Sequence, residues 1–328
     1  MVIGAASDEW SSNWAVVLGS SRYYHNYRHM ANVLAIYDIM KSVGMPDERI
    51  VVMGARDAAC DVRNPFPADV VAGTSSDKKH SNHLTKMELF SEDVIIDYKG
   101  LDVSVESFTR VMTGRHDEGT PASMRMDSDE DSNVFVYLTG HGGDGFFKFH
   151  DVEELTAVDM AAIINDMAAR TRYKEMLVFV DTCQAETMFE LVTAPRVTVI
   201  SSSLRGENSY AYNVNTTLGV APMDRFTLKV LHFFEQRRPW ADSHARLTVG
   251  DLIGTLDRRF LMSNVGVWMS PGARRPEEIL LTDYFAPSAH MHTRNRAQTQ
   301  THARSQRNQG AGVFQARDFD NSHLVSGL

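Results

Sequence analysis

Short runs of β-branched and aromatic residues alternate along the chain with segments of helical periodicity, from about residue 13 onward. The runs that predict buried strands are Trp14–Leu18, Ile50–Met53, Asn133–Thr139, Met176–Asp181 and Val197–Ser201. Strands that alternate with helices in this way are typical of a parallel sheet, because each crossover helix returns the chain to the same end. The pattern therefore predicts an α/β fold, a three-layer sandwich in which helices cover both faces of a mostly parallel sheet.

Apolar residues recur at helical spacing between these runs. The predicted helices begin at about Tyr27, at the capping box of Thr156 and Asp159, at Pro222, and at the capping pair of Thr248 and Asp251. Two further runs, Val94–Tyr98 and Leu101–Val105, flank a Lys-Gly pair. They predict a hairpin that leads into a helix ending near Gly114.

Composition changes the picture at the two ends of the chain. Residues 286–328 are rich in Gln, Asn, His and Thr, with more Arg than Asp, and they predict a disordered, basic, polar tail. Residues 1–12 are interpreted as an N-terminal remnant, which leaves 13–285 as one folded catalytic domain. The formal net charge of −9 argues against a nucleic-acid-binding protein, since phosphate contacts need Lys and Arg. No apolar run approaches the about 20 residues that cross a bilayer.

Two of the predicted strands end in residues that can do chemistry. The letters GHGGDG place His141 among glycines directly after the first strand, and Cys183 stands two residues past the end of the second. Because the carboxyl ends of parallel strands meet at one edge of a sheet, we expect the thiol and the imidazole to lie side by side. A thiol nucleophile with an acid/base partner is suited to acyl transfer.

The same pattern predicts how such a dyad is activated. An imidazolium at His141 and the N-terminus of a helix after Cys183 would depress the pKa of the thiol. The N–H groups of Gly142 and Cys183 could form an oxyanion hole, since glycine allows the backbone to approach a substrate closely.

Simpler interpretations exist for each residue alone. A cysteine after a strand is most often a core residue, and a histidine in a glycine loop is often a turn residue. The glycines also match the dinucleotide fingerprint GxGxxG, but the letters FFKF follow where that motif needs a helix. The coincidence of both residues at the strand ends of one βαβ unit favours the dyad.

Other polar positions carry weaker signals. Two groups could bind a cation but are more simply surface residues: His150, Asp151, Glu153 and Glu154, and the pair Asp47 and Asp97. The serines at 201–203, Ser202 among them, are expected to line the cleft. Asn215 begins the sequon NTT and is a glycosylation candidate if the protein is secretory. No metal site and no organic cofactor is predicted.

Longer stretches of the chain resemble a known family. The resemblance is carried by NWAVVLGSSRYYHNYRHMANVLAIYDIMKSVGMPDERIVVM, NVFVYLTGHGGDGFFKFHDVEEL, FVDTCQAETMFE, LGVAPMDRF and ILLTDYF. In consistent order over about residues 13–286, these segments resemble the legumain-type cysteine peptidases, and most closely the catalytic subunits of glycosylphosphatidylinositol (GPI) transamidases. The resemblance implies a caspase-like fold. It also implies an enzyme that cuts a carboxyl-terminal signal from a precursor and joins the new carboxyl end to the ethanolamine amine of a GPI lipid.

The resemblance assigns roles by position. It implies that Cys183 is the nucleophile, His141 the general acid/base, Gly142 part of the oxyanion hole, and Asn26 the residue that orients the histidine. As an alternative, Asn26 is a helix cap. The residues near the positions of the primary substrate pocket are Asp181, Asn208 and Ser209. Val220 stands where legumain has an acid, which weakens an Asn-reading pocket and suits a transamidase.

The resemblance leaves the exact reaction open. A free-standing legumain-like asparaginyl endopeptidase or ligase would share the catalytic residues, and Arg28 and His29 occur in both branches. A third alternative is a scaffold that acts through the basic tail. For a transamidase, the implied partners are the other subunits, the precursor signal and the GPI lipid, in the lumen of the endoplasmic reticulum, with membrane association through the partner subunits.

The chain has only two cysteines, which excludes a disulfide framework and a four-cysteine zinc site. If Cys183 stays reduced as the nucleophile, Cys60 has no partner within the chain. In an oxidising compartment it is a candidate for a disulfide to another subunit, as the resemblance also implies. The alternative is a buried, inert thiol.

Overall fold

The computed structural model of the chain describes residues 12–74, 85–88, 94–237 and 246–285. Its centre is a seven-stranded sheet in the order β12-β11-β10-β6-β1-β2-β5. The strands are β1 (Trp14–Gly19), β2 (Ile50–Gly54), β5 (Tyr98–Lys99), β6 (Asn133–Thr139), β10 (Glu175–Asp181), β11 (Val197–Ser201) and β12 (Gly266–Met269). Neighbouring strands run parallel except for the antiparallel pair β11 and β12. The predicted α/β fold with a mostly parallel sheet is confirmed.

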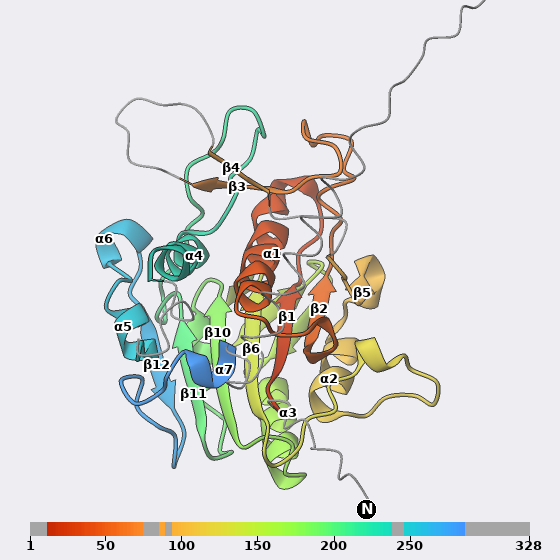
Figure 1. The fold of residues 1–328 in the computed structure, drawn as a ribbon, viewed down its shortest axis with the longest axis vertical. Coiled ribbons are helices and arrows are strands. Elements are labelled where there is room, and N and C mark those ends of the chain that lie inside the picture. The colour runs from red at the N-terminus through yellow and green to blue at the C-terminus, as the bar shows by residue number, and fades with distance from the viewer. Residues whose placement is uncertain (1–11, 75–84, 89–93, 238–245, 286–328) are drawn as a thin grey trace, which may run out of the picture. The chain divides into compact units, whose positions relative to one another are not determined.

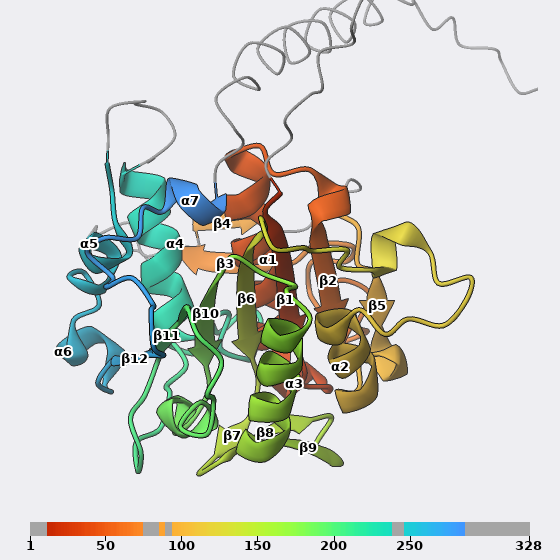
Figure 2. The same ribbon diagram turned by 90° about the horizontal axis from the view of Figure 1, so that it is seen from below.

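Helices cover both faces of this sheet. They are α1 (Tyr27–Ser42), α2 (Val105–Thr113), α3 (Ala157–Ala169), α4 (Arg225–Arg237), α5 (Val249–Ile253), α6 (Arg258–Leu261) and α7 (Thr282–Phe285). Figures 1 and 2 show α1 and α4 against one face, and α2 and α3 against the other. Alternate residues of β1 accordingly enter two separate cores: Ala15 and Val17 lie in the core with α1 and α4, and Val16 and Leu18 in the core with α2 and α3. Both faces of each central strand are buried, as the continuous apolar runs predicted.

Two small sheets extend the fold. Strands β7 (Gly142–Gly143), β8 (Phe146–Phe149) and β9 (Glu153–Thr156) form an antiparallel sheet just after β6, and Figure 2 shows it beyond the end of the central strands. Strands β3 (Val71–Thr74) and β4 (Thr85–Glu88) form an antiparallel pair. The β7–β9 sheet matters for function, because its first strand directly follows His141.

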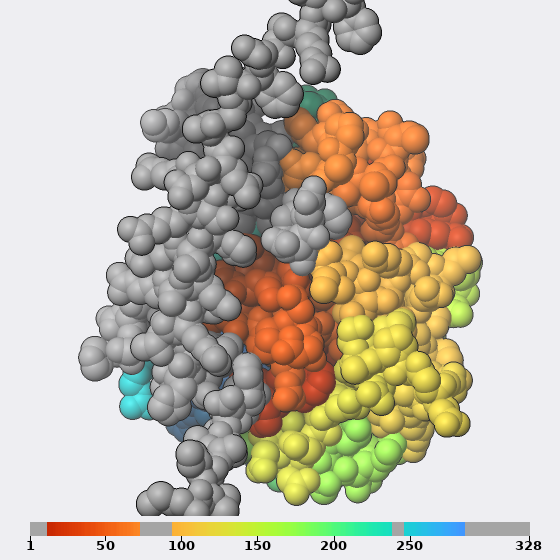
Figure 3. Space-filling model, turned by 45° about the vertical axis from the view of Figure 1, so that its right-hand side comes forward, coloured from red at the N-terminus to blue at the C-terminus, as the bar shows by residue number. Residues whose placement is uncertain are grey.

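The surface on the β5 side comes mainly from the first half of the chain, coloured red to yellow in Figure 3. Within the described part of the chain, no helix combines the length and the apolar character needed to cross a membrane. The predicted tail at 286–328 lies outside the described residues, as does the predicted remnant except for its last residue.

The predicted hairpin at Val94–Tyr98 and Leu101–Val105 is wrong. Tyr98 and Lys99 instead pair parallel with β2, and a 3-10 turn over Gly100–Asp102 leads directly into α2. The side chains of Ser104 and Ser107 cap the N-terminus of α2 reciprocally, which stops a second strand from forming. Leu101 is 81% exposed, so its apolar character did not mark a buried strand.

A smaller difference concerns the helix predicted from Pro222, which begins only at Arg225. The other predicted helices and strands are confirmed, including the capping boxes of α3 and α5. The edge strand β12 was not predicted. Its letters GVWM are apolar, but the strand has only four residues, and Val267 and Met269 are partly exposed at the sheet edge.

The packing yields a stability prediction. Phe179 on β10 is fully buried and packs edge-on against Phe135 and Phe226, with ring centroids 5.2 and 6.2 Å away. Replacing Phe179 by Ala should lower the free energy of unfolding by about 3–5 kcal/mol, because it leaves a cavity between sheet and helix. Urea unfolding of the full chain measures this. The control Leu101→Ala, at an exposed site, should change stability by less than about 0.5 kcal/mol; equal losses in both variants would contradict the assignment of this core.

Candidate active site

The two loops that carry the candidate dyad leave the sheet at the same level. Strands β6 and β10 are parallel neighbours in which Thr139 pairs with Asp181. His141 and Cys183 each stand two residues beyond that pair. The N–H of Gly140 also donates to the carbonyl of Asp181 at 3.4 Å, which holds the two chains together past the last ladder pair. Both residues therefore emerge at the same edge of the sheet, as the sequence predicted.

The two loops also contact each other directly. A Cβ atom at Gly142 would lie 2.6 Å from Oγ1 of Thr182 and 2.9 Å from the carbonyl oxygen of Phe146, so no other residue fits there without movement. The N–H of Gly145 donates to Oγ1 of Thr187 at 2.7 Å. Strand β8 follows where a dinucleotide fingerprint needs a helix, and the dinucleotide interpretation is therefore wrong.

Asn26 reaches the candidate base. Its Oδ1 lies 2.9 Å from Nε2 of His141, while its Nδ2 donates to the carbonyl of Arg22 at 2.8 Å. Nη1 of Arg28 also points at Oδ1, at 3.4 Å. A carbonyl can only accept and a guanidinium can only donate, so the orientation of the amide is determined. Nε2 of His141 must therefore be the donor, and Nδ1 is left to accept a proton.

This contact decides between the two interpretations of Asn26. Asn26 does occupy the N-cap position of α1, but its side chain makes no capping hydrogen bond. It is 2% exposed, and its amide is used for His141 and the Arg22 carbonyl instead. The side chain therefore acts on the histidine loop and not on the helix end.

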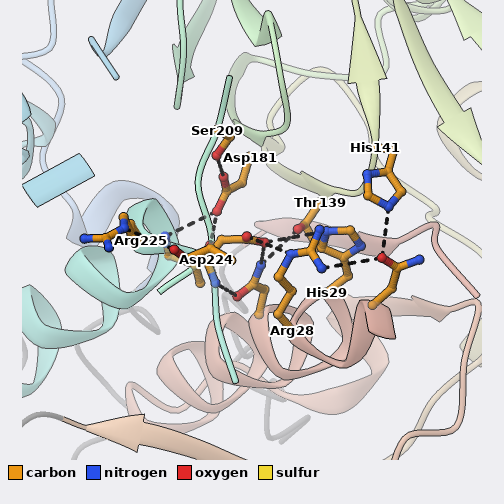
Figure 4. Close-up of polar contacts among 12 residues, drawn as sticks. Arg28, His29, Thr139, His141, Asp181, Ser209, Asp224 and Arg225 are labelled. Atoms are coloured by element: carbon orange, nitrogen blue, oxygen red, sulfur yellow. Dashed lines mark hydrogen bonds and ion pairs between the residues drawn. The ribbon is translucent and has the colours of Figure 1, made fainter. Parts of the chain in front are cut away.

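A buried polar network connects α1 to the ends of β6 and α4, as Figure 4 shows. Asp224, just before α4, accepts hydrogen bonds from Nε of Arg28 at 3.0 Å and from Nδ2 of Asn32 at 2.6 Å. Asn32 also bonds Oγ1 of Thr139 at 3.0 Å, at the end of the strand that carries the histidine loop. His29 packs edge-on against His141, with ring centroids 5.2 Å apart. The network thus fixes α1, and with it Asn26, against the catalytic edge.

Asp181, at the end of β10, lies under the cysteine loop. One carboxylate oxygen accepts a hydrogen bond from Oγ of Ser209 at 2.7 Å, and the other accepts one from Oγ1 of Thr227, also at 2.7 Å. Burial and the nearby carboxylate of Asp224 raise the pKa of Asp181 to about 7. Because both oxygens are occupied by the protein, Asp181 positions Ser209 and does not itself face the cleft.

The electrostatics of the dyad differ from the sequence-based prediction. Burial raises the pKa of the Cys183 thiol above its ordinary value, and the carboxylates of Asp224 and Asp181 act in the same direction. Burial and the positive charge of Arg28 lower the pKa of His141. The element after Cys183 is a short 3-10 helix over Ala185–Met188, not the α-helix that was expected to stabilise a thiolate. The predicted depression of the thiol pKa is therefore wrong, and the two shifts favour an uncharged thiol and an uncharged imidazole.

The predicted pocket residues fall into two groups. Ser209 lies at the site, since its carbonyl is 3.9 Å from Sγ of Cys183, and the neighbouring Asn208 is exposed. Ser202 is buried and its hydroxyl bonds the backbone of Thr182, so it supports the cysteine loop from below and does not line the cleft. Val220 is half-buried against the core beside α1 and α4.

The remaining predicted site residues make other contacts. Cys60 is exposed, so the interpretation as a buried thiol is wrong. Asn215 accepts hydrogen bonds from two N–H groups of its own turn, and glycosylation there stays a prediction. Asp47 is already paired with Lys41 at 2.8 Å. His150 is buried and bonds the carbonyl of Val103 at 2.7 Å. Across the ranges that the structure describes, no group of three or more His, Cys, Asp or Glu could hold a metal ion.

The sequence-based prediction missed Asp224 and Asn32, and it gave no role to Arg28 or His29. One signal for Asp224 was present, since an aspartate directly before a helix is a typical N-terminal residue. Nothing in the sequence pointed from Asp224 to α1, because Arg28 and Asp224 are 196 positions apart and only the fold brings them together.

A thiol and an imidazole at adjacent strand ends of a mostly parallel α/β fold are typical of the cysteine peptidases. Within that class, the chain belongs to the Peptidase C13 family, whose model matches residues 13–238. It is 44% identical to the GPI-anchor transamidase of Schizosaccharomyces pombe over 281 residues, which cover 86% of this chain and 71% of that one. It is 41% identical to the Saccharomyces cerevisiae GPI-anchor transamidase over 276 residues, 84% of this chain and 64% of that one. The resemblance to the GPI transamidases is thereby confirmed.

Among solved structures, caspase-1 from Spodoptera frugiperda matches with a TM-score of 0.44 at 9% identity, covering 86% of this chain and 92% of that chain.

The raised thiol pKa yields a testable pH dependence. In a Cys60→Ser background, alkylation of Cys183 by iodoacetamide should still accelerate with pH above 9.0, the ordinary thiol value, because the folded protein disfavours the thiolate. Unfolding the same variant in urea should return the midpoint to the ordinary range, which provides the internal control. A labelling rate that is already constant near neutral pH would show a preformed thiolate and contradict this electrostatic account.

Proposed function

We propose that this chain is the catalytic subunit of a GPI transamidase, which cleaves a carboxyl-terminal attachment signal and transfers the acyl group to the ethanolamine amine of a GPI lipid. The observation that carries the proposal is the joint presence of His141 and Cys183 on contacting loops of a chain 39–44% identical to proteins named GPI-anchor transamidase. The dyad lies within the matched segment, and it supplies the chemistry that those names require.

In the first step, Nδ1 of His141 takes the thiol proton as Sγ of Cys183 attacks the substrate carbonyl. Asn26 supports this role, because its Oδ1 accepts a hydrogen bond from Nε2–H of His141 and so leaves Nδ1 unprotonated. The C–S bond forms, the peptide C–N bond breaks, and His141 gives its proton to the leaving amine. The N–H groups of Gly142 and Cys183 are our candidates for the donors that stabilise the developing oxyanion.

In the second step, the ethanolamine amine attacks the thioester. His141 accepts the amine proton, the C–N bond forms, the C–S bond breaks, and the thiol is regenerated. A dyad that is neutral at rest suits both halves, since each begins with proton transfer to an unprotonated imidazole. The chemistry described uses no metal ion or organic cofactor.

Substrate recognition is proposed to involve the loop after β11. Ser209 and the exposed Asn208 lie beside the thiol, and Asp181 holds Ser209 from below. Val220 leaves no acid at the position that would read an Asn side chain. This supports a transamidase over a free-standing asparaginyl peptidase. Rapid cleavage of Asn-containing peptides by the purified chain alone would favour the peptidase instead.

The names of the relatives also support a location and partners. We propose that the chain works in the lumen of the endoplasmic reticulum, is held at the membrane by other subunits of the complex, and binds one of them through Cys60. The thiol of Cys60 is exposed on a loop in which buried Asp61 binds Arg56 and Arg63, so the loop presents it on a rigid support.

Variants of the dyad test the mechanism. Cys183→Ala should abolish attachment of a GPI anchor to a reporter precursor, and His141→Ala should lower it by about 10²–10⁴-fold, because proton transfer is lost. The control His116→Ala removes a histidine remote from the dyad and should leave the rate unchanged. GPI attachment that persists in Cys183→Ala would contradict the assignment of Cys183 as the nucleophile.

The Asn26 contact makes the pH profile informative in the same experiment. Because burial lowers the pKa of His141, the base stays unprotonated to lower pH, and the acid limb of the wild-type rate should lie below 6.5. In Asn26→Asp, the added negative charge should raise the His141 pKa and shift that limb to higher pH. A limb that does not move would show that Asn26 is not in contact with the working base.

The Cys60 bond is tested by non-reducing electrophoresis of the native complex. A heavier species that contains the chain should be present in the wild type and in Cys183→Ala, and absent in Cys60→Ser, because the proposed bond is made by the exposed thiol of Cys60. A wild-type chain that migrates only as a monomer without reductant would exclude the intermolecular disulfide.

A further inference from the structure

A stack of a half-buried arginine and two exposed rings directly precedes Asn26 in the chain. The guanidinium carbon of Arg22 lies 4.7 Å from the ring centroid of Tyr23. The ring of Tyr23 is in turn stacked on the ring of His25, with centroids 5.7 Å apart and planes 16° from parallel. Tyr23 is 44% exposed, and His25 is exposed as well. The mechanism above uses none of these three side chains, which we call the Arg22–Tyr23–His25 stack.

The stack lies next to the candidate dyad. The carbonyl of Arg22 accepts the hydrogen bond from Asn26, whose other amide atom binds His141. Positive charge at His25 lowers the pKa of the His141 imidazole. The stack is therefore connected through the single side chain of Asn26 to His141, the base that must deprotonate the incoming amine.

The backbone holds Tyr23 in a conformation that side chains rarely adopt. Its φ of 72° with ψ of 147° belongs to the region that glycine normally occupies, so the backbone at Tyr23 is strained. The flanking residues anchor it: Oη of buried Tyr24 bonds the carbonyl of Leu218 at 3.1 Å, and the N–H of Asn26 bonds the Tyr23 carbonyl at 3.0 Å. Strained backbone positions cluster at ligand-binding and active sites, and this one presents an exposed aromatic ring beside the candidate dyad.

The charges in this region single out Arg22. Arg28 is held by Asp224, and Arg63, which lies over the ring of Tyr24, is held by buried Asp61. Arg22 makes no ion pair with any of the residues that the structure describes, and its Nε is shielded from solvent without a hydrogen-bond partner. A guanidinium without a carboxylate is suited to bind a phosphate, and adjoining aromatic rings are suited to pack against the C–H face of a sugar.

We propose that the Arg22–Tyr23–His25 stack is the binding site for the head of the acyl acceptor, a sugar that carries its ethanolamine through a phosphate. Arg22 binds the phosphate, and the rings of Tyr23 and His25 contact the sugar. This inference rests on the proposed transamidase function and deepens it, because it assigns the second substrate to a site apart from the Asn208–Ser209 loop. Its consequence is that the amine enters from the Asn26 side and is deprotonated by His141 as its N–C bond forms and the C–S bond breaks.

Three acceptors separate this role from the others in a purified complex that contains the full chain. Hydroxylamine is a small nucleophile without phosphate or sugar, an aminoethyl hexoside has the sugar only, and a phosphoethanolamine-capped hexose has both groups. Arg22→Gln should raise the KM for the phosphate-bearing acceptor about 10- to 100-fold, the usual loss for a charged hydrogen bond. It should leave the hydroxylamine and aminoethyl hexoside reactions unchanged, and Arg22→Lys should restore part of the affinity. His25→Ala should raise the KM for both sugar-bearing acceptors.

The outcomes are distinguishable from each other. Arg115→Gln makes the same change of charge at Arg115, which is paired with Asp166 on the α2–α3 side, and should affect no acceptor. Equal losses with all three acceptors would mean that Arg22 only positions Asn26, and a raised KM for the precursor peptide would make the stack a peptide site; either result overturns the proposal, as does no effect at all. Failure of the wild type to transfer an acyl group to any amine would instead contradict the proposed function.

Discussion

The parallel pairing of β6 with β10 is the constraint on which the site depends. Because Thr139 and Asp181 are register partners, the loops that follow carry His141 and Cys183 away from the sheet at the same level. Slipping a β-strand by one residue moves its side chains to the opposite face, so the buried faces of both strands protect this register. The relative position of the two candidate side chains is therefore determined by apolar residues of two cores.

Buried acids behind this edge determine how the thiol works. Burial and the carboxylates of Asp224 and Asp181 disfavour a negative sulfur, and burial and Arg28 disfavour a positive imidazole, so the surroundings favour the uncharged form of both groups. A neutral thiol reacts slowly with oxidants and disulfides, which would protect Cys183 in an oxidising compartment. The same network holds α1 against β6 and so keeps Asn26 at the histidine. Stability of the fold and protonation of the site thus depend on the same few side chains.

Whether a helix or strand was predicted correctly depends on whether a short stretch of sequence determines it. The central strands were predicted well, because strands buried on both faces are continuous apolar runs. Helices α3 and α5 were predicted from their capping boxes, each of which lies within four consecutive residues. The hairpin before α2 was wrong, because a serine pair capped the helix without the usual acid. Strand β12 was missed although its letters GVWM are apolar, because it is a short edge strand whose formation depends on pairing with β11.

The sequence by itself determined the fold class, the strand ends that carry Cys183 and His141, and the family, since these depend on short-range pattern and on letters that adjoin each strand. Only the tertiary structure decided the directions in which the pKa values of Cys183 and His141 shift, the contact of Asn26 with His141, and the ion pair of Arg28 with Asp224. Burial and long-range pairing have no signature in a local stretch of residues, because they arise only when distant segments exclude water together. For the same reason, the Arg22–Tyr23–His25 stack could be identified only from the folded structure.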